Sequence, residues 1–363
     1  MRIAQVAPLA ESVPPKLYGG TERVVSWLTE ELIALGHDVT LFASGDSVTR
    51  GTLVPIVPRA IRLCRPRPDP FPAYAMQLDA IAEAATDFDI VHCHIDWVHL
   101  PVLNRLGIPH LTTIHNRLDT PDLPAVINRF RQAPLVSISD HHRLPLPSAN
   151  WLGTVYHGMP SATLEAGYEQ GSYLAFLGRL TKEKGPEVAI RLAKAAGMPL
   201  RMAAKIPRSE TRYYKERLRP LIDGEQIQLV GELNDAGKGD LLRGASALLF
   251  PIDWPEPFGL VMIEAMACGT PVIAFRRGSV PEVVDEGVTG FVVDNEDEAL
   301  AAIERIGELD RRRVRARFDQ RFTARRMAEE YLRHYERLLQ SETRRALATV
   351  RMFDSAEATP VAP

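Results

Sequence analysis

Short apolar runs alternate with amphipathic segments along the first half of the chain. The run at residues 3–7 predicts a strand, Thr21 is expected to cap a helix with an apolar inner face, and Gly36 is expected to end that helix before a second strand. Strand–helix–strand repeats of this kind are typical of a parallel sheet with helices on both faces. The strands predicted in this half are 3–7, 38–43, 90–93, 111–114, 135–138 and 154–156.

The same pattern starts again in the second half. A polar, aperiodic stretch at 157–172 separates the two series and reads as a linker between domains. We therefore predict an α/β protein with two Rossmann-like, doubly wound parallel-sheet domains, residues 1–160 and 161–334, that face each other across a cleft. The strands predicted in the second half are 173–177, 200–203, 227–230, 247–250, 272–275 and 291–293.

The C-terminal part differs from both series. Residues 323–339 predict a strongly amphipathic helix, and we expect the chain around 335–350 to rejoin the first domain. The last residues, 351–363, have the composition of a disordered tail.

Composition narrows the class of protein. The 363 residues are 45% hydrophobic and 25% charged, and the formal net charge is −3, so no overall field favours nucleic acid. Three separated cysteines argue against disulfides and favour a reducing compartment. The N-terminus begins as a strand, and no apolar run reaches the length of a membrane span. These features predict a cytoplasmic protein, with peripheral contact at the inner face of the membrane left open.

One carboxylate interrupts an apolar helix. Residues 260–267 are apolar on every face except at Glu264, and a buried carboxylate must be paired or hydrogen-bonded. An Arg or Lys of the protein would serve, and so would two vicinal hydroxyls of a ligand. Glu256 lies in the turn before this helix, where unpaired backbone N–H groups favour an anion. This wall suits a nucleotide sugar, although a structural salt bridge is the simpler reading of Glu264 alone.

Two further segments carry candidate phosphate contacts. Arg179 and Lys184 stand where a strand, YLAFLGR, turns into a helix opened by Pro186. In the first domain, Gly19 and Gly20 precede a helix and let the backbone approach a ligand closely. The GxGxxG turn of NAD-dependent dehydrogenases is missing after the first strand, which argues against that class.

Taken together, these segments resemble the family 4 retaining glycosyltransferases of the GT-B fold, a superfamily that includes glycogen synthase and phosphatidylinositol mannosyltransferases. The resemblance extends from KLYGGTERVV to the helix ending near Leu339, and the most specific motif has two glutamates separated by seven residues. The matching segments are YGGTERVV, VHCHIDWV, TTIHN, VSISD, VYHGM, LGRLTKEKG, LVGEL and PEPFGLVMIEAMACGTPVIA.

The resemblance implies a role for each candidate residue. It places the donor sugar on Glu256, the nucleotide ribose on Glu264 and the diphosphate on Arg179 and Lys184, with His115 facing the sugar. It thus implies the catalytic residues Glu256, His115, Arg179 and Lys184, and the donor-binding residues Gly19, Gly20, Glu264, Phe258, Gly259 and Leu260.

The resemblance also implies a reaction. A hexosyl group would pass from a nucleotide-diphosphate sugar, with a UDP-sugar favoured, to a hydroxyl of a sugar, lipid-linked sugar or small molecule, with retention of anomeric configuration. No cofactor and no metal are expected, because Arg179, Lys184 and helix N-termini can stabilise the leaving diphosphate. The alternatives are another GT-B enzyme, such as an epimerase, and a binding protein without catalysis.

Three polar segments have plainer readings. His92 and His94 point the same way on one strand, but no third metal ligand is evident, so we expect buried or cleft-lining histidines. The arginine-rich loop 59–68 could contact a phosphorylated acceptor or anionic lipid, although a solvated loop is the simpler reading. The segment RRRVRARFDQR reads as an exposed helical face.

Overall fold

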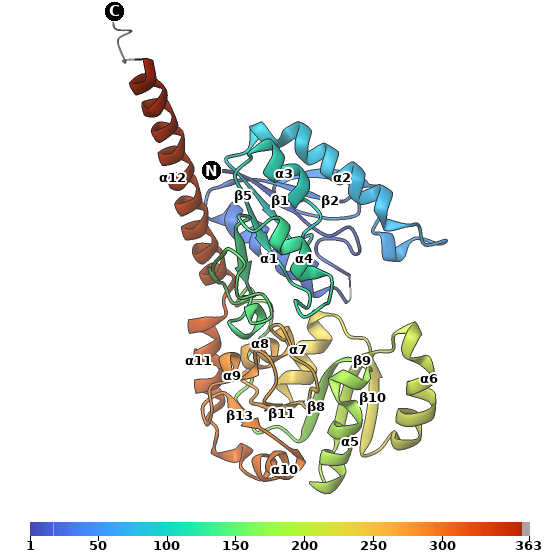
Figure 1. Cartoon of the computed structure of the whole chain (residues 1–363). Helices are drawn as coiled ribbons and strands as arrows, with labels where there is room; N and C mark the ends of the chain where they lie inside the picture. Colours follow the sequence, from blue (N-terminus) through green and yellow to red (C-terminus); the bar gives the residue numbers. More distant parts are fainter. Residues whose placement is uncertain (17, 358–363) are drawn as a thin grey trace, which may run out of the picture.

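The computed structural model describes residues 1–16 and 18–357, with side chains up to residue 341. It shows two α/β domains, one above the other in Figure 1, each built on a parallel sheet. The GT-B architecture expected from the sequence is confirmed. Since ligands of such sheets bind beyond the carboxyl ends of the strands, the facing edges of the two domains are where a site is expected.

The N-terminal sheet has seven strands in the order β3-β2-β1-β4-β5-β6-β7, all parallel. Its strands are β1 (Arg2–Val6), β2 (Asp38–Ser44), β3 (Thr52–Val57), β4 (Ile90–Cys93), β5 (His110–Thr113), β6 (Leu135–Ser137) and β7 (Trp151–Thr154), and its helices are α1 (Gly20–Ala34), α2 (Pro70–Ala84), α3 (Leu100–Leu106) and α4 (Leu123–Arg129).

The C-terminal sheet has six parallel strands in the order β10-β9-β8-β11-β12-β13. Its strands are β8 (Tyr173–Arg179), β9 (Leu200–Lys205), β10 (Ile227–Gly231), β11 (Ala245–Phe250), β12 (Val272–Phe275) and β13 (Gly290–Val293), and its helices are α5 (Pro186–Ala195), α6 (Thr211–Tyr213), α7 (Asp235–Arg243), α8 (Leu260–Ala267), α9 (Val280–Val283), α10 (Glu296–Glu304) and α11 (Arg311–Arg321).

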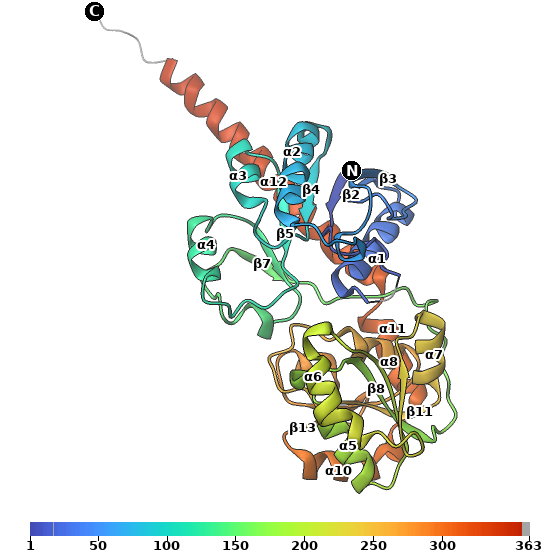
Figure 2. The same ribbon diagram turned by 90° about the vertical axis from the view of Figure 1, so that its right-hand side faces the viewer.

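The last helix, α12 (Ala324–Glu357), leaves the C-terminal domain and runs along the N-terminal one, as both Figures 1 and 2 show. The return to the first domain therefore begins at Ala324 rather than near residue 335. Residues 351–357, expected to belong to a disordered tail, are helical backbone here, and 358–363 lie outside the described residues.

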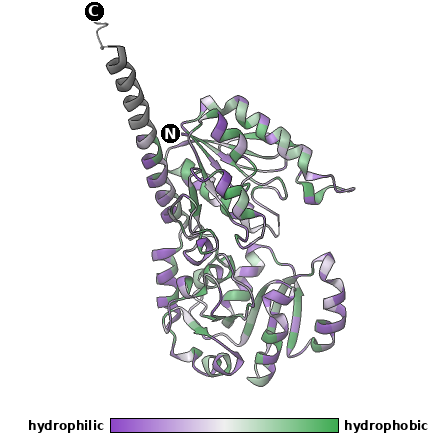
Figure 3. Cartoon of the chain, viewed as in Figure 1, coloured by the Kyte–Doolittle hydropathy of each residue, from purple (hydrophilic) through white to green (hydrophobic). Residues whose placement is uncertain are grey.

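The strands carry the core. Figure 3 shows hydrophobic residues along the strands, whereas many helices alternate between hydrophobic and hydrophilic positions. Buried residues of α12, including Met327, Tyr331 and Tyr335, belong to a core cluster that also contains residues of α1, α8 and the strands of both sheets. The helix therefore stabilises the junction of the domains as well as the first domain.

Two local predictions were incomplete. Strand β3 was not predicted, since it lies at the sheet edge and its residues are only half-buried or exposed, which weakens the apolar pattern. Thr21 was expected to cap α1, but the helix begins at Gly20 and Gly19 occupies the cap position without a side-chain bond. All the strands that were predicted are present, and their ends differ from the predicted ones by up to three residues.

Candidate functional site

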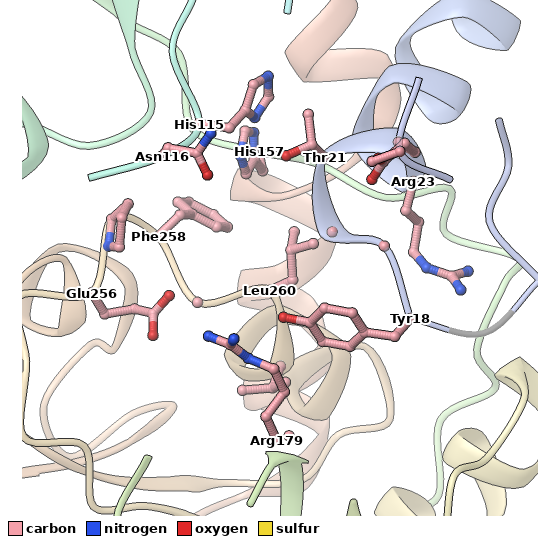
Figure 4. Close-up of a pocket in the computed structure, with 18 of the residues that line it drawn as sticks. Tyr18, Thr21, Arg23, His115, Asn116, His157, Arg179, Glu256, Phe258 and Leu260 are labelled. Atoms are coloured by element: carbon pink, nitrogen blue, oxygen red, sulfur yellow. The ribbon is translucent and has the colours of Figure 1, made fainter. Parts of the chain in front are cut away.

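A cleft of about 890 Å³ lies between the domains and is lined by residues of both. Figure 4 shows Glu256 and Arg179 on the C-terminal wall, with Tyr18 hanging over Arg179 and His115 on the opposite side. The structure brings every candidate residue from the sequence to this one cleft. These residues are Gly19, Gly20, His115, Arg179, Lys184, Glu256, Phe258, Gly259, Leu260 and Glu264.

The turn that carries Glu256 is held from both domains. Ser279 donates its backbone N–H to the Glu256 carbonyl (3.0 Å) and its hydroxyl to the Phe258 carbonyl (2.8 Å). From the N-terminal domain, the Ser139 hydroxyl donates to the Pro257 carbonyl at 2.7 Å. Gly278 packs so closely that a Cβ there would lie 2.3 Å from the Glu256 carbonyl oxygen. The backbone of the turn is therefore fixed before any ligand binds.

The side chain of Glu256 is paired inside the cleft. Its carboxylate accepts a hydrogen bond from the Lys184 ammonium and another from the Trp254 indole N–H at 3.0 Å. The Lys184 ammonium also lies 4.9 Å from the Trp254 ring centroid. Both charges are largely buried, and a ligand that replaces one partner must supply the matching charge or hydrogen bond.

Helix α8 points its N-terminus into the same wall. Gly259 caps it in the left-handed region at φ 80°, where a Cβ would lie 2.7 Å from the Met262 side chain. The first N–H groups of a helix lack intrahelical acceptors and favour an anion. Gly20 faces this turn from α1, and a Cβ on it would lie 3.7 Å from Leu260. The start of α1 and the start of α8 therefore lie within van der Waals distance of each other at this wall of the cleft.

Glu264 has a protein partner that the sequence did not reveal. Its carboxylate accepts a hydrogen bond from Lys238 on α7, and Lys238 also lies 3.0 Å from Asp235. Burial opposes the charge on Lys238, but the carboxylate of Glu264, together with Asp235, outweighs it and holds the pKa of Lys238 above its usual value. Asp235 is bound in turn by Arg23 of α1 at 2.7 and 3.0 Å. This row of charges joins the two domains at the cleft.

Arg179 is less completely paired. Its guanidinium lies 3.7 Å from the Glu183 carboxylate, while its Nε is buried and has no hydrogen-bond partner. The ring of Tyr18 covers it, with 5.8 Å between the guanidinium carbon and the ring centroid. Arg179 and Lys184 line the same cleft, so the two cations can bind a phosphate together.

His115 is the innermost candidate on the N-terminal side. Its ring stacks on His157 with centroids 5.1 Å apart, and His157 packs edge-on against Phe258 (Figure 4). Its Nε2 bonds to His94 Nδ1 at 2.9 Å, whereas its Nδ1 is buried without a partner. Burial, with a smaller contribution from His142, lowers the pKa of His115 to about 3. The imidazole is therefore neutral near pH 7.

Several residues of the cleft were missed from the sequence. Lys238 and its neighbour Asp235 gave no signal, because each is an ordinary charge at the start of a polar helix, and Arg23 was not singled out although it lies within the motif YGGTERVV. Asp96 did have a sequence signal, because it lies two residues after His94 within the motif VHCHIDWV. It is the non-glycine residue with positive φ (52°) in the described chain, its Oδ1 has no partner, and burial raises the pKa of its carboxyl.

The remaining polar segments occupy distinct places. His92 and His94 lie side by side in the interior, with ring centroids 4.1 Å apart, which confirms that they are buried. Among the described residues, no three His, Cys, Asp or Glu side chains are grouped to hold a metal ion. Of the arginine loop, Arg62 reaches the cleft and lies 3.6 Å from Glu11. No described helix combines the length and apolarity needed to cross a bilayer.

Comparisons with known proteins agree with this geometry. The sequence model described as "Glycosyl transferases group 1" matches residues 165–323, and that described as "Glycosyltransferase Family 4" matches residues 18–150. The domains with their facing cleft thus define a GT-B glycosyltransferase. The chain is a family 4-like glycosyltransferase of this fold, a hexosyltransferase that acts on nucleotide sugars.

Individual relatives match over most of their length. A phosphatidyl-myo-inositol mannosyltransferase of Mycolicibacterium smegmatis is 27% identical, with 87% of this chain and 86% of the relative covered. Among solved structures, AviGT4, a glycosyltransferase involved in avilamycin A biosynthesis, is 25% identical with a TM-score of 0.69, covering 94% of this chain and 98% of AviGT4. Anabaena HepE in complex with UDP-glucose shares the fold at 17% identity, with a TM-score of 0.69 and coverage of 94% and 100%.

Proposed function

We propose that the chain transfers a hexosyl group from a UDP-sugar to a hydroxyl-bearing acceptor, with retention of anomeric configuration and without a metal ion. One observation carries the proposal: two cations and two carboxylates from four segments of the C-terminal domain converge on the cleft wall that faces His115. The two cations would neutralise the charge of a diphosphate. The two carboxylates would accept hydrogen bonds from the hydroxyls of the sugar and the ribose.

The ion pairs of the free protein indicate how donor binding proceeds. Lys184 neutralises Glu256, and Lys238 neutralises Glu264, so neither buried carboxylate is uncompensated in the empty cleft. A nucleotide sugar would give Lys184 and the guanidinium of Arg179 a diphosphate to bind. The sugar and ribose hydroxyls would then donate to Glu256 and Glu264, and each charge of the free state would keep a partner in the complex.

Retention with a single bond exchange requires that both groups use one face of the sugar. The bond between the anomeric carbon and the diphosphate oxygen breaks, and its electron pair leaves with the diphosphate. The acceptor oxygen forms the new bond on the same face, and its proton passes to the departing oxygen. Arg179, Lys184 and the N-terminus of α8 stabilise the charge that develops on the diphosphate. The support for retention is the resemblance to retaining enzymes.

The choice of uridine rests on the fold. HepE, which shares it, binds UDP-glucose. Relatives named for inositol-containing acceptors suggest that a polyhydroxyl acceptor fits such an N-terminal domain. Arg62 at the cleft would suit an acceptor with a phosphate.

The first test replaces Glu256 by Gln. UDP-, GDP- and ADP-sugars are incubated with the wild type and the variant in EDTA, and nucleotide release and the sugar product are measured. We expect release from a UDP-sugar by the wild type, a loss of about 100-fold or more in the variant, and nucleotide binding within a few-fold of the wild type. Glu296→Gln is the control, because Glu296 also pairs with an arginine but lies on the exposed α10.

Each other outcome removes a part of the proposal. Release that needs an added metal would remove metal independence, and a product of inverted configuration would remove retention. Conversion of the donor to an isomeric sugar would show an epimerase. Nucleotide binding without turnover of any donor, even with candidate acceptors present, would show a binding protein.

A further inference from the structure

A continuous chain of hydrogen bonds connects His115 in the cleft with helix α12, more than 200 residues later in the sequence. His115 Nε2 meets His94 Nδ1 at 2.9 Å, His94 Nε2 meets Gln5 Oε1 at 2.9 Å, and Gln5 Nε2 donates to the Tyr335 hydroxyl at 3.3 Å. The Tyr335 hydroxyl also lies 2.7 Å from His92 Nδ1. Gln5, His92 and Tyr335 are fully buried, and His94 nearly so.

The chain continues beyond His92 to a second tyrosine of α12. His92 Nε2 lies 2.8 Å from the Thr113 hydroxyl, which lies 2.9 Å from the Tyr331 hydroxyl. Burial lowers the pKa of His92 and of His94 well below the usual value. Each imidazole of the chain is therefore neutral and has one N–H and one lone pair.

The direction of the chain follows from Gln5. Its side-chain oxygen can only accept, so His94 Nε2 must carry the hydrogen and His94 Nδ1 must be a lone pair. His115 Nε2 then has to be the donor toward His94. A neutral His115 that has its hydrogen on Nε2 has a lone pair on Nδ1, the nitrogen that has no partner among the described residues.

We propose that Gln5 and Tyr335 are positioning residues that hold His115 in its Nε2–H tautomer, so that Nδ1 accepts a hydrogen bond from a hydroxyl of the bound sugar. The second half of this statement rests on the proposed function, whereas the first half does not. Tyr335 acts through Gln5: in this orientation its hydroxyl accepts the Gln5 N–H and donates to His92, so the Gln5 amide is hydrogen-bonded on both its nitrogen and its oxygen.

The opposite direction leaves a donor, rather than an acceptor, unpaired at His115 Nδ1. It would require the Gln5 amide to be turned over, with Tyr335 donating to Gln5 and every later bond reversed. His115 Nδ1 would then carry an N–H that is buried without an acceptor, and an unpaired buried donor costs about 1–3 kcal/mol. The chosen direction leaves a lone pair there, which an incoming sugar hydroxyl can satisfy.

The test reads the tautomer directly. The protein is labelled with ¹⁵N-histidine, and the ring nitrogens of His115 are assigned by comparison with His115→Gln. We expect a protonated Nε2 and an unprotonated Nδ1 for free wild-type protein between about pH 6 and 8. This measurement needs no substrate, so it stands even if no donor is turned over. A protonated Nδ1 in the wild type would overturn the proposal without any further variant.

Two matched variants then separate positioning from simple packing. Tyr335→Phe removes the hydroxyl that is bonded to Gln5. Tyr331→Phe removes an equally buried hydroxyl one turn earlier on α12, at the end of the hydrogen-bond chain that is farthest from His115. We expect Tyr335→Phe to give mixed His115 tautomers and to lower kcat about tenfold, the effect of one hydrogen bond. Nucleotide affinity should not change, because Tyr335 contacts none of the proposed nucleotide-binding residues.

Tyr331→Phe should leave the tautomer as in the wild type and kcat within about twofold. An equal loss of kcat in the two variants, or an unchanged His115 tautomer in Tyr335→Phe, would show that α12 only packs against the sheet. Either result would refute the positioning role of Tyr335. A fixed tautomer with no transfer activity toward any donor would refute the sugar contact together with the proposed function, and would leave the role of Gln5 and Tyr335 supported.

Discussion

Glu256 depends on a residue that never touches the ligand. Gly278 has a positive φ of 55° and lies against the backbone of Glu256, where a Cβ would approach its N and O atoms to 2.4 and 2.3 Å. No rotamer can relieve such a contact, because both atoms belong to the backbone. The carboxylate is therefore positioned by the absence of a side chain twenty-two residues later in the chain.

Replacing Gly278 by Ala should displace the turn of Glu256. We expect the activity to fall at least tenfold and the affinity for the donor to weaken, since a shift of about 1 Å at a catalytic group is costly. Steady-state kinetics and donor titrations measure both effects. Gly287→Ala is the matched control: Gly287 also has a positive φ (67°), but a Cβ there would meet nothing within 4 Å. Equal losses in the two variants would show that backbone strain, and not the contact with Glu256, is responsible.

The sequence was informative about some site residues and silent about others, for a physical reason. Glu264 was conspicuous because a carboxylate in an apolar helix needs a partner, and Arg179 and Lys184 stand at a recognisable strand-to-helix junction. Lys238 was not conspicuous, because a lysine near the start of a polar helix is usually solvated. Its importance comes from a distance in space to Glu264 that no local pattern encodes.

Helix α11 shows a comparable effect at the scale of elements. Its many arginines suggested an exposed face, and that reading was wrong for two of them. Arg311 is 8% exposed and donates to the carbonyls of Gly167, Arg243 and Ala245 and to the Thr270 hydroxyl, at 2.7–2.9 Å. Arg315 donates to the Ala267 carbonyl at the C-terminal end of α8. These bonds fix the helix whose other end forms the site.

Removal of the Arg311 side chain should therefore be severe. We expect Arg311→Ala to lower the free energy of unfolding by about 3 kcal/mol or more, because it leaves several buried carbonyls without donors. Chemical denaturation followed by circular dichroism measures this. Arg313→Ala, on the exposed face of the same helix, is the control and should change stability by less than about 0.5 kcal/mol. A loss below about 1 kcal/mol in Arg311→Ala would contradict the buried role.

The elements themselves were largely predictable. Strands β4 and β12 have the predicted bounds because their residues are almost all buried and mostly apolar, which makes the run easy to recognise. Strand β3 was missed because an edge strand has a weak pattern. The extent of α12 depended on tertiary contacts: its tyrosines are buried against strands β4 and β5, and the sequence showed an apolar face without showing its partner.

At the scale of the whole molecule, the histidines make stability depend on pH. Burial lowers the pKa of nine histidines in the folded state, whereas in the unfolded chain their pKa is near 6.5. Between these values the unfolded state binds more protons, so stability is complete above about pH 7 and falls as the pH is lowered. The nine are His37, His92, His94, His99, His110, His115, His142, His157 and His334.

We therefore expect the free energy of unfolding to be lower at pH 5.5 than at pH 7.5 by several kcal/mol, since each buried histidine contributes up to about 1.4 kcal/mol per pH unit below 6.5. Glu22 and Asp96, whose pKa values burial raises, act in the opposite direction. Urea denaturation at the two pH values is the measurement. His99 is not part of the hydrogen-bond chain that ends at His115, and His99→Gln should reduce the difference in unfolding free energy between the two pH values. Equal or greater stability at pH 5.5 would contradict the burial of neutral imidazoles.

The chain crosses between the domains twice, and the two crossings run side by side. Met159 and Thr323 form a parallel bridge, with Met159 N–H donating to the Phe322 carbonyl and Ala324 N–H to the Met159 carbonyl, both at 2.9 Å. A single connecting strand would let one domain twist freely about it. Two segments joined at this bridge resist twisting of one domain about the other, and they leave bending across the bridge as the easier movement. Opening and closing of the cleft would then follow that bend.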